Sequence, residues 1–89
     1  MKSSSANSMY IATFFTHYGA QEFHRHQVKK DSTAHMMPVP RALSAACGIC
    51  VAFDQDDSAA IQASMPEDIE GLYHYADNKF STIFEIEEE

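Results

Sequence analysis

The stretch MPVPRALSAACGIC, residues 37–50, brings two prolines and both cysteines of the chain into one short span. Proline fixes φ and lacks a backbone donor, so Pro38 and Pro40 end regular strand pairing and hold the segment partly extended. After Pro40 we expect one short helical turn or an ordered loop, which breaks at Gly48 because glycine most easily adopts positive φ. Cys47 lies at that break. The stretch therefore predicts a loop that presents a thiol between regular elements.

Strands are expected before and after this loop. Residues 9–15 and 48–53 are apolar on both alternating faces, a pattern typical of inner strands that are covered on both sides. Residues 33–39 predict a strand that Pro38 and Pro40 stop, and an edge position suits it better than a central one. The loop should thus join an edge strand to an inner strand.

Helices are expected between the strands. Residues 17–30 place apolar side chains at helical spacing, and Thr16 before them can act as an N-cap. The acids of residues 54–57 supply caps and first-turn charge for a second helix, which Pro66 closes.

Residues 69–76 and 80–86 flank the turn Asp77-Asn78, which predicts a terminal hairpin. The order strand, helix, strand, strand, helix, strand fits an α+β, ferredoxin-like βαββαβ sandwich, with two helices on one face of an antiparallel or mixed sheet. We expect its first and third strands to be central and parallel, and the final strand to be added at one edge.

A chain of 89 residues holds one domain with a small core. We expect a disordered tail over residues 1–8, a single domain over residues 9–87 and an acidic tail at residues 88–89. No apolar run is long enough to cross a bilayer, and nothing at the N-terminus has the pattern of a signal peptide. Two cysteines without an export signal favour a reducing compartment, so we expect a cytoplasmic protein that does not contact membranes.

The net charge of −7 predicts a surface that repels phosphate backbones, so nucleic acid is not an expected partner. The sequence also lacks a phosphate-binding glycine loop, a Ser-His-Asp spacing and an isolated carboxylate pair. We therefore expect no cofactor and no self-contained enzyme.

Cys47 has two interpretations. As a carrier thiol it would accept a sulfur atom as a persulfide and pass it on, which requires thiolate character and access, and Arg41 is a candidate positive charge nearby. As a small buried hydrophobe it would be inert, which is the commonest fate of a free cysteine.

Cys47 and Cys50 formally match a CxxC motif. An offset of three on a strand points the two side chains to opposite faces, so a disulfide would need the turn at Gly48. We expect a buried Cys50, with dithiol redox chemistry as an alternative. A soft metal held by both cysteines and one histidine is a further alternative, but a single thiol pair is weak evidence, and we expect no metal site.

The segments PVPR (38–41) and SAACG (44–48), preceded by a strand that ends FFTH (14–17), resemble a family of small domains known as putative selenium/sulfur carrier protein-like. In that family a Pro-x-Pro-Arg segment leads through small residues to Cys-Gly and an apolar strand. The resemblance covers about residues 9–75. It implies that Pro40, Arg41, Cys47 and Gly48 are motif positions, with Cys47 as the residue that bears sulfur or selenium.

The chain departs from the family pattern in three ways. Ala45 and Ala46 stand where hydroxylated residues are expected, Cys50 adds a second thiol, and the terminal hairpin lies outside the pattern. The alanines remove donors that could stabilise a persulfide anion, and the hairpin is a candidate edge for a homodimer.

These observations predict a small accessory protein that presents Cys47 to proteins that donate or accept sulfur or selenium. Arg41 is its expected electrostatic neighbour, and Cys50 is a secondary thiol. The residues expected to shape the loop are Pro38, Pro40, Ser44 and Gly48. A small metal-binding module and a protein-interaction module without sulfur transfer are the alternatives.

Overall fold

The computed structural model describes residues 8–43 and 45–87. Of the tail predicted over residues 1–8, residues 1–7 lie outside the described residues, and Ser8 is the first residue of a strand. The predicted tail at residues 88–89 and the predicted loop residue Ser44 also lie outside the described residues. In chain order the elements are β1 (Ser8–Phe14), α1 (His17–Gln27), β2 (His35–Pro38), β3 (Ile49–Phe53), α2 (Ser58–Ser64), β4 (Ile69–Ala76) and β5 (Lys79–Glu85). This is the predicted order of strands and helices.

The strands form one sheet in the order β2-β3-β1-β4-β5, and every neighbouring pair is antiparallel. The expectation that the first and third strands run parallel is wrong. Helix α1 returns the chain so that β2 runs in the direction of β1, and β3 then reverses direction and lies between them. The domain is α+β, and its fifth strand lies at an edge, so it matches the four-stranded ferredoxin-like sandwich only in part.

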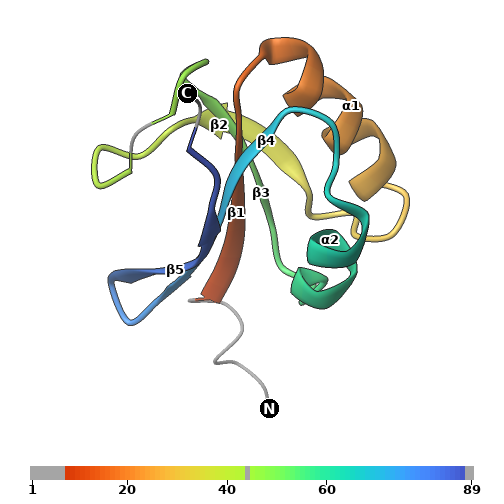
Figure 1. Ribbon diagram of the computed structural model, residues 1–89. Coiled ribbons are helices and arrows are strands. Elements are labelled where there is room, and N and C mark those ends of the chain that lie inside the picture. Colours follow the sequence, from red (N-terminus) through yellow and green to blue (C-terminus); the bar gives the residue numbers. More distant parts are fainter. Residues whose placement is uncertain (1–7, 44, 88–89) are drawn as a thin grey trace.

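Both helices cover the same face of the sheet (Figure 1), as predicted. On that face, Phe14 of β1 and Phe53 of β3 pack against Phe23 of α1, with ring centroids 5.3 Å and 5.8 Å away from that of Phe23. Buried aromatic side chains contribute much of the stability of a small core. The packing of α1 on β1 and β3 therefore holds this helix against the sheet from which the loops extend.

The other face of the sheet has its own apolar cluster, which includes Ile11 and Cys50. No helix covers it in the described part of the chain. Val39 and Leu43, from the loop after β2, pack there instead, together with Phe80 of β5. The predicted apolar character of β1 and β3 on both faces is therefore confirmed, and the loop after β2 forms part of the core.

Side-chain bonds tie the helices to the loops. Thr16 Oγ1 accepts the backbone N–H of Gly19 at 3.0 Å, which confirms the predicted N-cap of α1. Asp57 occupies the N-cap position of α2, but its carboxylate accepts Nε2 of Gln27 at 2.8 Å instead of capping its own helix. Asp57 thus joins the start of α2 to the end of α1.

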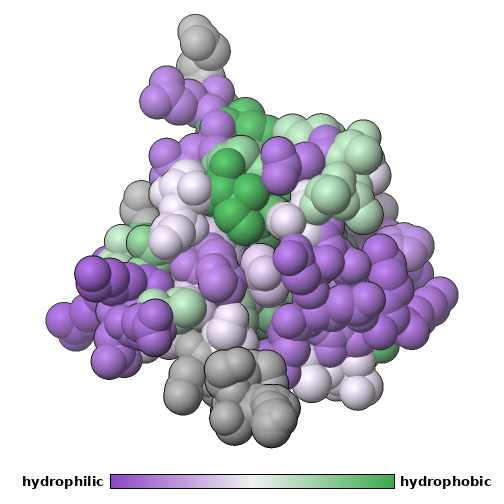
Figure 2. Space-filling model, turned by 90° about the horizontal axis from the view of Figure 1, so that it is seen from below, coloured by the Kyte–Doolittle hydropathy of each residue, from purple (hydrophilic) through white to green (hydrophobic). Residues whose placement is uncertain are grey.

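The loop after β2 and the start of α1 lie at one end of the sheet, at the top of Figure 1. Figure 2 shows the molecule from the opposite end, where hydrophilic residues cover much of the surface and hydrophobic residues gather in a smaller area. Cys50 pairs with Thr13, near the end of β1 that leads into α1, and Cys47 lies in the loop just before β3.

Candidate thiol site

Residues 39–48 form a closed loop between β2 and β3. The N–H of Val39 donates to the carbonyl of Gly48 at 3.1 Å and joins the two ends, and the N–H of Leu43 donates to the carbonyl of Pro40 at 3.0 Å to make a turn. Gly48 has a φ of 76° and open space around it, so the backbone conformation and not packing favours glycine there. The described part of this loop contains no helix, so of the two predicted forms the ordered loop is the one observed.

Cys47 lies one residue before Gly48, at the predicted break. Its side chain is half-buried and free, and it packs at the edge of the helix-side core. The thiol donates to the carbonyl of Ile49 at 3.3 Å, a weak bond that folds the side chain back toward β3. The thiol therefore has a hydrogen-bond partner and remains partly accessible to solvent.

Two side chains from distant parts of the chain brace the loop beside Cys47. Nε2 of His17, the first residue of α1, lies 3.0 Å from the carbonyl oxygen of Cys47, which can only accept, so the ring donates. Oε1 of Glu70 accepts the backbone N–H of Ala46 at 3.0 Å. Both bonds act on the backbone of the loop, so they fix where the thiol sits.

Glu70 reaches the loop because β4 contains a bulge. Thr13 pairs with Gly71 and Phe14 pairs with Ile69, which leaves Glu70 as an extra residue. A bulge changes the direction of the extra side chain and is common next to functional sites. Sequence reasoning missed the roles of Glu70 and His17 because both contacts depend on the tertiary fold, and that of Glu70 also on the register between β1 and β4.

Cys50 differs from Cys47 in burial and in the face of the sheet on which it lies. It is fully buried in the cluster on the other face of the sheet, as the alternation along β3 predicted. Burial, and secondarily the charge of Cys47, raises the pKa of Cys50 to about 11. Both cysteines are free thiols and lie in different core clusters, so the CxxC spacing does not form a disulfide.

The other residues predicted to shape the loop lie at different places in the structure. Pro38 ends β2 at the sheet edge, as expected from its missing N–H, and Pro40 begins the turn that Leu43 closes. Arg41 is exposed, and within residues 8–43 and 45–87 it takes part in no ion pair. The expected role of Arg41 as the electrostatic neighbour of Cys47 stays a prediction.

Residues 9–73 match the family model described as "Putative Se/S carrier protein-like". The chain belongs to this family. Searches of curated proteins and of solved structures found no match. The match to the Se/S carrier-like family covers β1 through most of β4, including the whole loop with Cys47, and leaves β5 outside.

Metal binding has little support in this member of the Se/S carrier-like family. Among the described residues, no three His, Cys, Asp or Glu side chains gather closely enough to hold a metal ion. The alternative of Cys47, Cys50 and one histidine as ligands fails because the two thiols lie in different clusters. Over the same residues, no helix has the length and apolar character to span a bilayer.

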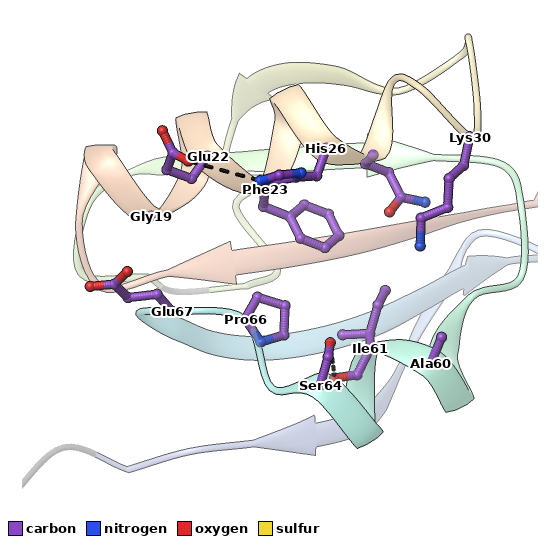
Figure 3. A pocket seen from close by; sticks show the side chains of 11 residues that line it. Gly19, Glu22, Phe23, His26, Lys30, Ala60, Ile61, Ser64, Pro66 and Glu67 are labelled. Carbon is purple, nitrogen blue, oxygen red and sulfur yellow. Dashed lines mark hydrogen bonds and ion pairs between the residues drawn. The ribbon is translucent and has the colours of Figure 1, made fainter.

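A groove of about 310 Å³ lies between α1 and α2, away from the thiol. Figure 3 shows Phe23 and Ile61 pointing into it from the two helices, with Lys30 at one end and Glu67 at the other. Gln27, which is 2% exposed, also lines it and is held by Asp57. This groove shares no lining residue with the described part of the loop of residues 39–48.

Proposed function

We propose that the chain carries sulfur or selenium as a persulfide or its selenium counterpart on Cys47, and that partner proteins load and unload it. One observation carries the proposal. Of the two thiols, Cys47 alone is partly accessible, and it lies in a closed loop that two distant side chains brace. A carrier thiol needs both access and a fixed position, because each partner must reach the same sulfur atom.

The position of Cys47 suits a persulfide anion. The carbonyl of Cys47 is bonded to His17, the first residue of α1, and the N-terminus of a helix favours nearby negative charge. The loop itself contains no described helix whose C-terminal end would oppose that charge. We infer that the start of α1, in addition to Arg41, favours negative charge on the loop that carries Cys47.

The transfer step conserves atoms and electrons. The Cys47 thiolate attacks the outer sulfur of a donor persulfide, a new S–S bond forms at Cys47, the S–S bond of the donor breaks, and the donor leaves as a thiolate. The transferred sulfur keeps its proton or releases it to solvent. Unloading is the same exchange with an acceptor thiolate, so neither step needs an external oxidant or reductant.

The test is a loading and unloading cycle with cysteine persulfide as donor and cyanide as acceptor, which removes the outer sulfur as thiocyanate. We expect Cys47→Ser to abolish both loading and thiocyanate release, because it removes the acceptor atom. Cys50→Ser is the matched control and is expected to leave both unchanged, since Cys50 is buried. Equal loss in the two variants, or retention in Cys47→Ser, would contradict the proposal.

The homodimer expected from the terminal hairpin stays a prediction. β5 forms one outer edge of the sheet, and the turn Asp77-Asn78 has positive φ at both residues, as a tight hairpin requires. Sedimentation of the full chain tests it.

A further inference from the structure

Glu70 contacts two segments that are far apart in the sequence. Its side chain holds the loop beside Cys47, and its backbone carbonyl accepts the N–H of Ile86 at 2.7 Å. We propose that Glu70 is a positioning residue for Cys47, and that the segment after β5 controls the exposure of the thiol through this residue. The proposal rests on Cys47 as the carrier thiol, but it is tested below without sulfur transfer.

The side-chain bond is the first step. A charged carboxylate that accepts a backbone N–H makes one of the stronger hydrogen bonds in proteins. The donor, Ala46, directly precedes Cys47, so movement of Glu70 moves the backbone that carries the thiol. Because Glu70 is the extra residue of a bulge, the ladder between β1 and β4 does not hold it by itself.

The segment after β5 is the second step. Ile86 is the residue directly after β5, and its N–H binds the carbonyl of Glu70 on the outer side of β4. Close by, Glu85 accepts the hydroxyl of Tyr73 at 2.9 Å, and burial together with this carboxylate raises the pKa of Tyr73 to about 12. The end of β5 is therefore anchored to β4 at two successive residues.

The loop with Cys47 and the segment after β5 share an apolar neighbourhood. The side chains of Cys47 and Ile86 pack against the same helix-side core, although they are far apart in the sequence. Release of the segment after β5 would therefore loosen the brace on the loop and open the core that both side chains share.

The brace is tested by hydrogen exchange of the Ala46 amide and by the alkylation rate of Cys47, both measured on the full chain. Glu70→Ala is expected to raise each about tenfold, because a bond to a charged acceptor is lost. Ile86→Pro removes the donor N–H and is expected to raise the Ala46 exchange rate about fivefold, as expected for one neutral bond. Ile86→Val keeps that N–H and most of the apolar side chain and is the matched control, with little effect on Ala46.

Cys50 reports whether a variant stays folded, because it is buried on the other face of the sheet. If Ile86→Pro exposes Cys50, hydrogen exchange of the wild-type chain at low denaturant provides the test instead. The Ala46 and Ile86 amides should then exchange through the same opening, before Cys50 becomes reactive. Unchanged Ala46 exchange in Glu70→Ala, or independent opening of Ala46 and Ile86, would overturn the proposal. Failure of sulfur loading with an intact brace would instead count against the proposed function alone.

Discussion

The replacement Asp31→Asn is expected to lower the free energy of unfolding at neutral pH by about 3 kcal/mol, because it removes the charged acceptor of several hydrogen bonds. Asp31 is only 7% exposed and joins the loop after α1 to the loop after β3. One carboxylate oxygen accepts the N–H of Asp54 at 2.9 Å and that of Gln55 at 2.6 Å. The other accepts the N–H of Thr33 at 2.9 Å and its hydroxyl. An asparagine would turn an NH₂ group toward one of these donor pairs.

The pH dependence of this contribution has a definite sign. Burial by itself raises the pKa of Asp31, but the bonds from Thr33, Gln55 and Asp54 outweigh it, so the pKa lies below its ordinary value of 3.8. The unfolded chain therefore binds the proton more readily. The stabilisation from Asp31 is present above the unfolded pKa and is lost as the pH falls through the folded pKa.

Urea denaturation of wild type and Asp31→Asn between pH 7 and pH 3 measures both effects. We expect a difference of about 3 kcal/mol near pH 7 that narrows below about pH 4. Asp54→Asn is the matched control: it removes an exposed carboxylate, leaves the backbone N–H that Asp31 binds, and should change stability by less than about 0.5 kcal/mol. A difference between wild type and Asp31→Asn that grows toward acid pH would contradict the role of Asp31.

Alkylation of Cys50 is expected to be at least about a hundredfold slower in the folded protein than in the denatured chain at neutral pH. Only the thiolate reacts, and burial raises the pKa of Cys50 from 9.0 to about 11, so each of those two units removes a factor of about ten from the thiolate population. Restricted access adds to this factor. Cys47, half-buried in the loop, should react in the folded protein well before Cys50 does.

The measurement is the rate at which iodoacetamide alkylates each cysteine, followed by mass spectrometry in buffer and in about 6 M urea. In the folded protein the Cys50 rate should keep rising with pH up to about 11, and in urea the two cysteines should react at similar rates. Similar alkylation rates of Cys47 and Cys50 in buffer would show that Cys50 is not protected. They would contradict the burial of Cys50 in the folded protein.

The sequence could predict the elements and the edge strands because these depend on local pattern. Strands β1 and β3 are apolar on both faces and are inner strands, whereas Pro38 places β2 at an edge. The direction of β3 relative to β1 was predicted wrongly, because apolar alternation carries no information about strand direction. Only the actual pairing, Tyr10 with Phe53 and Thr13 with Cys50, determines it.

In the candidate site, too, the local features could be predicted from the sequence and the long-range contacts could not. Proline and glycine punctuation predicted the loop and the place of Cys47, since both residue types act on their own backbone. The contacts from His17 and Glu70 span 30 and 24 residues of sequence and depend on the tertiary fold. Arg41 is close to Cys47 in sequence and is exposed, and its role beside the thiol stays a prediction.

The most direct test of the central claim is to expose the folded wild-type protein to cysteine persulfide and to map the added sulfur to each cysteine by mass spectrometry. We expect the sulfur on Cys47, with Cys50 unmodified until the chain is denatured. Added sulfur on Cys50, or equal amounts on both thiols of the folded protein, would contradict the assignment of Cys47 as the carrier residue.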